Sequence, residues 1–397
     1  MTAPPSGIFR QPDFVRLWSA GLVVFIVRWL ETLAVGVFIY RDTGSPFLVA
    51  MMTMLRMLPM ALLGAVFGAM AERIDRRMAL IVIVVQMMAT SIVLAALAFA
   101  GHLAIWHLAV ASLLNGLSWA ADNPVRRAMM GEAVGMERMA RAMSADVASN
   151  NSSRMLGPTL GGILLAVVGI EGAFALCAAL YIFALWAAMG VSRPAMRARS
   201  GGSFIARMAE GLAVVRRDPR LIATLLVTII YNVFGWPFSS MIVVLGKDNF
   251  GLGPIGIGIL ASTEGIGAFI GAVSAALWAS PRHYGRVYCG GVILYLLVLI
   301  VFAQVSNLVI GGLALLLTGI GGACFAAMQT TIVYLAAPAE VRGRVLGILS
   351  VCIGSAAIGF VQLGIIANMF GTVTACTFTG LAGLAAMAAT WRWWRLI

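Results

Sequence analysis

The sequence predicts an all-α membrane protein with twelve transmembrane helices in two pseudo-symmetric bundles of six. Its 397 residues are 61% hydrophobic and 11% charged, and no water-soluble fold buries that much apolar surface. The apolar residues form runs of about 20 residues or more, the length that a helix needs to cross a bilayer. Short polar junctions separate the runs, and the basic residues gather at every second junction. These observations give the fold class and the topology.

The basic residues set the expected orientation. Of 27 Lys and Arg residues, only Arg41 and Lys247 lie on the opposite set of junctions. Because basic residues mark the cytoplasmic ends of spans, we expect both termini in the cytoplasm of a cell with a bacterial-type cytoplasmic (inner) membrane. We also expect membrane lipid as a partner, and no nucleic acid. The basic junctions are Arg10 and Arg16 before the first span, Arg73 to Arg77 after the second, Arg126 to Arg141 after the fourth, Arg193 to Arg220 after the sixth, Arg282 and Arg286 after the eighth, Arg342 and Arg344 after the tenth, and Arg392 and Arg395 at the end.

Between these junctions the chain divides into three units. We expect a six-helix bundle over 1–191, a cytoplasmic linker over 192–220 and a second six-helix bundle over 221–397. An amphipathic helix over 204–215 is expected to lie along the membrane surface. The predicted spans are 16–40, 46–71, 78–99, 103–125, 144–168, 172–191, 221–246, 254–279, 286–305, 308–336, 344–367 and 372–394.

A charge pattern recurs between the two halves. Each half has an Arg-x3-Arg pair after its second span and a Glu-x3-Arg pair before its fifth. Such recurrence indicates two copies of one six-helix unit in parallel orientation. The pairs are Arg73 with Arg77, Arg282 with Arg286, Glu137 with Arg141, and Glu340 with Arg344.

Several segments resemble a known family. Gly64–Arg77, GAVFGAMAERIDRR, is similar to the signature that the major facilitator superfamily carries between its second and third helices. The segment departs from it at Glu72, where the family has Asp, and at Asp75, where Gly is usual and gives a more permissive turn. Arg154–Gly162, RMLGPTLGG, resembles the Gly-Pro-x2-Gly-Gly motif of the family's antiporters. Residues 9–18, 123–127 and 338–347 resemble the branch of drug and siderophore exporters.

The resemblance implies the major facilitator fold and roles for two motifs. The charged residues around the second junction are expected to form a conformational latch that breaks when the halves rock apart; the alternative is ordinary positive-inside charge. The glycine-rich strip of the fifth span is expected to seal the halves against proton leak; the alternative is close helix packing. The latch comprises Glu72, Arg73, Arg76, Arg77 and Asp122, and the strip comprises Gly157, Pro158, Gly161 and Gly162.

Five charged side chains lie inside the spans, near the expected midplane. They are Arg28, Glu31, Arg56, Arg154 and Glu264. Buried charge in a bilayer is costly and marks functional sites, so we expect them to line a substrate and proton cavity. None is on the third, sixth, ninth or twelfth helix, which the resemblance places against lipid.

The five charges suggest separate roles. Arg28 and Glu31 share a helix face, so part of their charge cancels locally. Arg56 and Arg154 then favour an anionic substrate, because guanidinium binds acidic groups in a bidentate manner; the alternative is that they brace helices through Glu31. Glu264 has no cationic partner in its own half and is the expected proton carrier. Further cavity candidates, for which helix packing is the alternative, are Asn115, Trp119, Tyr231, Asn232, Trp236, Gln329, Tyr334 and Gln362.

The sequence has no sign of enzymatic chemistry. It lacks a nucleophile with a paired base, metal-ligand spacing and a Gly-x4-Gly-Lys phosphate loop, so we expect no catalytic residue, metal or cofactor. We expect a monomeric secondary active transporter that exports a small organic molecule, driven by protons through alternating access. Two alternatives stay open: a passive carrier of lipid, lysolipid or metabolite without proton coupling, and a non-transporting membrane receptor.

The topology is directly testable. A reporter fused after Arg199 should read cytoplasmic, and one inserted beside Lys247 should read external. A cysteine placed at Asp248 should react with an impermeant thiol reagent added outside the cell. Protection of that cysteine in intact cells, with reaction only after lysis, would contradict the twelve-span topology.

Overall fold

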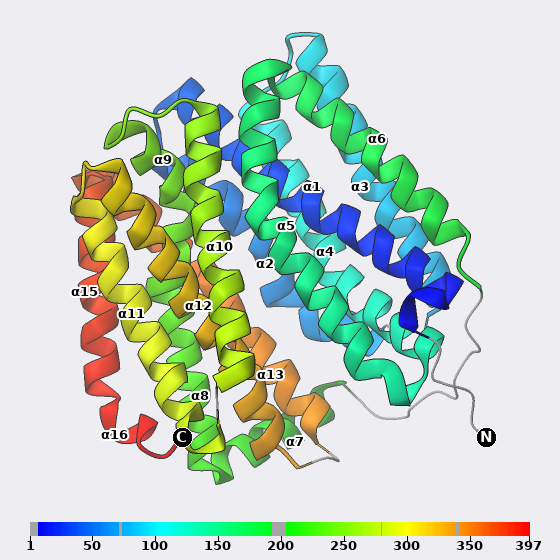
Figure 1. The fold of residues 1–397 in the computed structure, drawn as a ribbon, viewed down its shortest axis with the longest axis vertical. Coiled ribbons are helices and arrows are strands. Elements are labelled where there is room, and N and C mark those ends of the chain that lie inside the picture. The colour runs from blue at the N-terminus through cyan, green and yellow to red at the C-terminus, as the bar shows by residue number, and fades with distance from the viewer. Residues whose placement is uncertain (1–6, 71–73, 193–203, 279, 339–340) are drawn as a thin grey trace.

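The computed structural model describes residues 7–70, 74–192, 204–278, 280–338 and 341–397, and it contains helices and no strand within those ranges. Glu72, Arg73 and three of the linker's seven basic residues, Arg193, Arg197 and Arg199, lie outside them. Figure 1 shows two groups of helices, α1 to α6 and α8 to α15, standing side by side, with α7 at one end. We call the end of the molecule that holds α7 (Phe204–Arg217) the linker side and the opposite end, which holds Thr43 and Asp248, the far side.

The N-terminal half consists of six long helices. They are α1 (Pro12–Thr43), α2 (Pro46–Met70), α3 (Arg76–Phe99), α4 (Ile105–Val134), α5 (Met139–Val167) and α6 (Gly169–Met189), with 3-10 turns at η1 (Ile8–Arg10) and η2 (Met136–Arg138).

The C-terminal half contains two spans that are broken into shorter helices. Its seventh span comprises α8 (Pro219–Ile230), η3 (Tyr231–Gly235), η4 (Trp236–Ser240) and α9 (Met241–Asp248). Its eleventh comprises α13 (Arg342–Gly354) and α14 (Ala356–Phe370). The other elements are α10 (Pro254–Trp278), η5 (Pro281–His283), α11 (Tyr284–Gln304), α12 (Leu308–Ala336), α15 (Thr372–Ala389) and α16 (Trp391–Trp394).

The all-α membrane class is confirmed. Within the described ranges, 10 helical segments are long and apolar enough to cross a membrane. Of the twelve expected spans, α4 and α5 are the two that are not apolar enough to be counted. Charged and amide side chains interrupt their apolar residues. Both helices extend further than predicted toward each other, since α4 ends at Val134 and α5 begins at Met139. Arg126 and Arg127 therefore lie within a helix and not at a junction.

The turn before α3 does not require the glycine that the family usually has. Asp75 is the N-cap of α3, and its Oδ1 accepts hydrogen bonds from the backbone N–H groups of Arg77 at 3.0 Å and Met78 at 3.1 Å. Asp75 has φ −64°, which any residue adopts readily. An aspartate here satisfies helix donors that a glycine would leave to water.

The seventh span was predicted as a continuous helix over 221–246, and the structure breaks it in the middle. A π-helical turn covers Tyr231–Gly235 and a 3-10 turn covers Trp236–Ser240. Pro237 has no N–H to donate and its ring displaces the preceding carbonyl, which disrupts a regular helix at this point. The irregular stretch carries Trp236 near the middle of the segment Pro219–Asp248.

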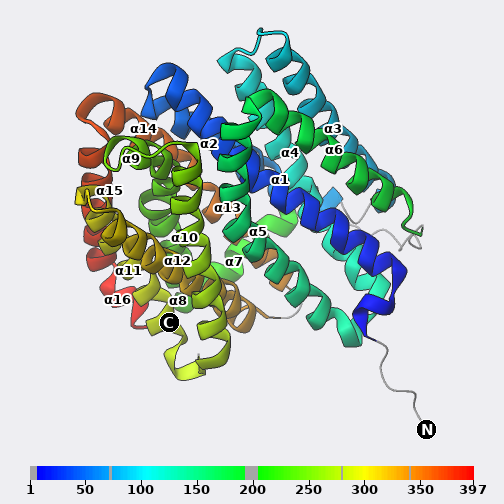
Figure 2. The ribbon, with the colours of Figure 1, turned by 45° about the horizontal axis from the view of Figure 1, so that its top comes forward.

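The two halves meet through close backbone contact between α5 and α10. A Cβ atom placed on Gly258 would stand 2.6 Å from the carbonyl oxygen of Pro158, and one on Gly265 would stand 2.6 Å from that of Arg154. Thr159 N donates to Ser262 Oγ at 3.2 Å across the same contact. Figure 2 shows α5 between α1 of its own half and α10 of the other. Small residues thus allow the backbones of α5 and α10 to touch.

A second contact between the halves lies on the far side. Tyr40 OH donates to Asp248 Oδ2 at 2.6 Å, and Lys247 Nζ lies 5.2 Å from the centre of the Tyr40 ring. In the middle of the molecule, α2 packs against α13 and α14. The halves are therefore joined at the far side and at the level of the buried charges.

Candidate functional site

Arg56 of α2 forms an ion pair with Glu31 of α1. Arg56 Nη2 donates to Glu31 Oε2 at 2.7 Å, and the side chains are 10% and 3% exposed. Glu31 also accepts from Ser91 Oγ at 3.2 Å and from Asn115 Nδ2 at 3.1 Å. Glu31 is thus fixed by α2, α3 and α4 of its own half. The expected local cancellation between Arg28 and Glu31 is not what the structure contains.

Arg154 of α5 pairs with Glu264 of α10, so this bond crosses between the two halves. Arg154 Nη2 donates to Glu264 Oε1 at 2.7 Å, and the side chains are 14% and 7% exposed. Among the described residues of its own half Glu264 has no cationic partner, as the sequence indicated, but the opposite half supplies one. We call this ion pair the bridging pair.

Arg28 lies between tryptophan rings. Its Cζ is 4.8 Å from the centre of the Trp29 ring and 4.4 Å from that of Trp119 on α4. Arg154 Cζ is 5.5 Å from the Trp29 ring and 5.2 Å from the Trp236 ring. Two guanidinium groups and three indoles therefore alternate from α4 across to the broken seventh span. We call Trp119, Arg28, Trp29, Arg154 and Trp236 the aromatic row.

The pairing decides where the positive surplus lies. Each of Arg56 and Arg154 is held by one glutamate, whereas no acidic side chain among the described residues forms an ion pair with Arg28. Three arginines and two glutamates leave one positive charge. The sequence argument instead counted the N-terminal half alone and left Arg56 and Arg154 both without a partner. The structure places the one surplus charge on Arg28.

Asn232 and Trp236 occupy different surroundings, although both were predicted for the cavity. Asn232 is 4% exposed, and its Nδ2 donates to the carbonyl oxygen of Thr228 at 2.9 Å. Gln329 Nε2 donates to Thr228 Oγ1 at 3.0 Å, and Thr228 Oγ1 is 2.8 Å from Tyr288 OH. Asn232 thus adjoins a hydrogen-bonded network inside the C-terminal half, while Trp236 joins the charged residues.

The glycine-rich strip of α5 faces two helices. A Cβ on Gly157 would stand 2.6 Å from Trp29 Cβ, and one on Gly161 would stand 2.8 Å from the carbonyl oxygen of Leu30. Gly162 lies against the backbone of Pro254 on α10. The strip thus fits α5 closely to α1 and to the other half. Its role in preventing proton leak stays a prediction.

The three predicted latch residues that the structure describes have different partners. Arg76 pairs with Glu132, and Arg77 Nη2 donates to the carbonyl oxygen of Met189 at 2.6 Å. Asp122 lies elsewhere, beside Arg126. Glu72 and Arg73 lie outside the described residues.

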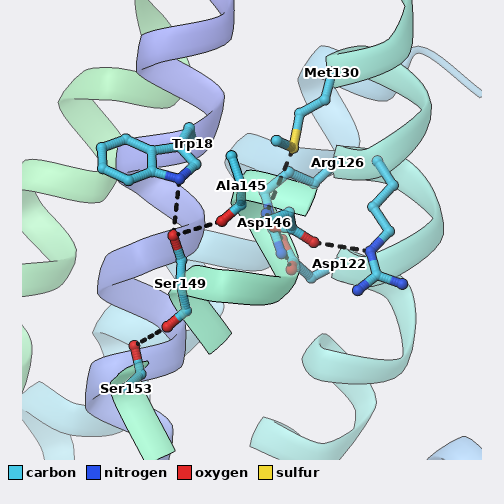
Figure 3. A network of polar contacts seen from close by, with 9 residues as sticks. Trp18, Asp122, Arg126, Met130, Ala145, Asp146, Ser149 and Ser153 are labelled. Atoms are coloured by element: carbon cyan, nitrogen blue, oxygen red, sulfur yellow. Dashed lines mark hydrogen bonds and ion pairs between the residues drawn. The ribbon is translucent and has the colours of Figure 1, made fainter. Parts of the chain in front are cut away.

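Asp122 belongs to a buried charge network between α4 and α5 that sequence reasoning missed. Arg126 Nε is 3.0 Å from Asp122 Oδ2, and Arg126 Nη1 is 2.5 Å from Asp146 Oδ1. Asp146 Oδ2 accepts from Arg127 Nε at 2.9 Å. Asp122 and Arg126 are 0% exposed and Asp146 is 1% exposed. Two acids and two arginines balance, so we call these four residues the balanced network; Figure 3 shows three of its members.

Helix α1 packs against the balanced network and against α5 beside it. Trp18 Nε1 donates to Ser149 Oγ at 2.8 Å, as Figure 3 shows. The position of Gly21 leaves room for the guanidinium of Arg126, which a Cβ there would strike. Asp122 and Arg126 are four residues apart, a spacing that puts both on one helix face. That spacing was the available signal, but Arg126 was counted as a junction charge.

The fold and the membrane-embedded charges define a membrane transporter of the major facilitator superfamily. The sequence profile described as transmembrane secretion effector matches residues 3–395, and the chain belongs to that family.

Similar proteins include efflux proteins. Macrolide efflux protein A of Streptococcus pyogenes is 24% identical over 270 residues, which are 67% of each chain. The uncharacterized MFS-type transporter YfiS of Bacillus subtilis is 24% identical over 388 residues, 94% of this chain and 91% of that protein. Among solved structures, a bacterial homologue of the human lysosomal transporter Spinster, in an inward-facing and unoccupied conformation, superposes with a TM-score of 0.79 at 14% identity. That match covers 100% of this chain and 98% of the other.

The balanced network yields a stability prediction. Asp146→Ala leaves Arg126 buried with half of its acidic partners removed, and we expect a loss of about 3–5 kcal/mol in unfolding free energy, the usual cost of breaking a buried pair. The matched control is Asp13→Ala, which removes a partly exposed partner of Arg16 and should cost at most about 1 kcal/mol. Unfolding of the unmodified protein and both variants in the same detergent measures the two losses of unfolding free energy. Equal stability of the two variants would contradict the assignment.

Proposed function

We propose that this transporter exports a small organic molecule across the cytoplasmic membrane by alternating access, coupled to inward movement of protons. Membership of an efflux-type family supports export. The bridging pair supports the coupling, because one ionisable bond joins the two halves at the centre of the molecule. The linker side is taken as cytoplasmic, the far side as external, and the monomer as the working unit.

The bridging pair acts as a lock in this proposal. Separating Arg154 from Glu264 without compensation would leave two unpaired charges in a poorly solvated interior, which is strongly unfavourable. The halves therefore part at this point only when Glu264 loses its charge or when Arg154 gains another anion. An empty, unprotonated transporter stays locked, which prevents futile reorientation.

Protonation of Glu264 releases the lock. A neutral carboxyl group no longer attracts the charge of Arg154. The guanidinium still keeps its cation–π contacts with the rings of Trp29 and Trp236. Glu31 is less suited to this role. Its donors Arg56, Ser91 and Asn115 all belong to the N-terminal half, so a proton on Glu31 breaks no bond between the halves.

The proton carrier can be tested in proteoliposomes loaded with a radiolabelled macrolide, the compound class in the name of one relative. Glu264→Gln should abolish efflux driven by a pH gradient, because glutamine cannot exchange a proton. It should retain substrate exchange at equal pH, because the bridging pair of this variant is always neutralised and no longer locks the halves together. A fluorescent aryl carboxylate serves as a second probe if macrolides are not carried.

The matched control is Glu171→Gln, the same chemical change in the first turn of α6, away from the bridging pair. It should keep gradient-driven efflux. Full gradient-driven efflux by Glu264→Gln would reject Glu264 as the carrier. Efflux by the unmodified protein that ignores a protonophore would indicate a passive carrier, and no movement of any probe would favour a receptor.

A further inference from the structure

Of the three arginines inside the predicted spans, Arg28 is the one that forms no ion pair with a described residue. Its guanidinium carries five N–H donors, and it lies over the faces of Trp29 and Trp119 without a hydrogen bond to any described residue. The side chain is half-buried, so these donors remain accessible. Arg56 binds the backbone carbonyl oxygen of Arg28 at 3.2 Å, which fixes the main chain at this point and leaves the guanidinium free.

The two indoles that enclose Arg28 also present unused donors. Trp29 Nε1 and Trp119 Nε1 are both buried and have no hydrogen-bond acceptor among the described residues. Buried polar groups in native structures nearly always have a partner. An arginine and two indoles thus form a group of donors on α1 and α4 without an acceptor of their own.

The nearby acids are committed elsewhere. Glu31 accepts hydrogen bonds from Arg56, Ser91 and Asn115, and Glu264 is held by Arg154. If Glu31 turned toward Arg28, Arg56 would lose its ion-pair partner while its side chain is only 10% exposed. Asp122 is held by Arg126. No acidic side chain among the described residues is thus left to pair with Arg28, and its guanidinium is open to an anion from outside the chain.

The chemistry of the three side chains defines that anion. A guanidinium binds a carboxylate or phosphate through two parallel hydrogen bonds. Trp29 and Trp119 are both partly exposed, so each keeps some apolar ring surface beside the guanidinium that suits an aromatic or hydrophobic body. A molecule with an acidic group on an apolar body satisfies both.

We infer that Arg28, Trp29 and Trp119 form a subsite that binds the acidic group of an amphipathic organic anion, and that such anions are preferred substrates of this transporter. The claim that these anions are transported rests on the proposed function, whereas the claim that they bind at this subsite does not. It uses residues distinct from the bridging pair. An anion on Arg28 leaves the bond between Arg154 and Glu264 in place, so the acidic group and the proton have separate sites.

A matched pair of ligands tests the subsite in the purified full-length protein. The probes are 1-pyrenebutyric acid and its methyl ester, which share one apolar body and differ in charge. The unmodified protein should bind the acid more tightly than the ester. Arg28→Gln should weaken binding of the acid by about tenfold or more, the worth of a charge-assisted hydrogen bond, and leave binding of the ester unchanged.

Two further variants separate recognition from folding. Arg28→Lys keeps the charge without the planar fork and should lose part of the preference for the acid. Trp119→Phe keeps a ring without its N–H and should weaken binding of the acid a few-fold with little effect on the ester. The matched control is Arg41→Gln on the far-side end of the same helix, which should change neither affinity.

Each outcome bears on one claim. Equal affinity of the unmodified protein for acid and ester, or an unchanged affinity for the acid in Arg28→Gln, overturns the subsite. Gradient-driven efflux that persists in that case leaves the proposed function standing. Loss of acid binding in Arg28→Gln, in a protein that shows no gradient-driven transport, supports the subsite and rejects the proposed function.

Discussion

The bridging pair is the constraint on which the rest of this structure depends. A charge inside a bilayer protein must be paired or solvated, and here the partner of Glu264 comes from the opposite half of the chain. The bond requires α5 and α10 to approach closely, which the small residues Gly162, Gly258 and Gly265 allow. The aromatic row then supports Arg154 on both sides. Packing and electrostatics thus specify the same contact between the halves.

The sequence was sufficient for the fold class and for five of the interior charges, but not for their pairing or for the balanced network. Hydropathy and basic junctions report depth and topology, so Arg56 and Glu264 were placed correctly inside candidate membrane spans, and Arg154 inside a long helix. Pairing depends on helix rotation and on contacts between distant segments, which spacing does not encode. Arg126 was missed for a related reason: an arginine near a predicted helix end looks the same whether it faces water or a buried aspartate. The break at Pro237 was likewise hidden within a continuous apolar run.

Proton coupling and the net positive charge at Arg28 have a joint consequence. Protonating Glu264 adds one positive charge to the cavity, so at equilibrium a proton and an organic anion favour each other's binding. Antiport therefore cannot rest on competition for one residue. It requires that the lock opens in two ways, by protonation of Glu264 in the empty transporter and by an anion that reaches Arg154 in the loaded one. The membrane potential assists export of an anion, since an inside-negative potential contributes about 2.3 kcal/mol per elementary charge per 100 mV.

The lock itself can be observed as a distance. Spin labels at exposed Ser144 of α5 and Arg282 of η5, one on each half at the linker side, report separation of the halves in a background without the five native cysteines. Electron–electron resonance should show that acidification shifts the distance distribution of the unmodified protein. Glu264→Gln should give the acid-type distribution at every pH, because its bridging pair is always neutralised. A distribution that ignores pH in the unmodified protein, or that shifts equally with pH in Glu264→Gln, would contradict the account.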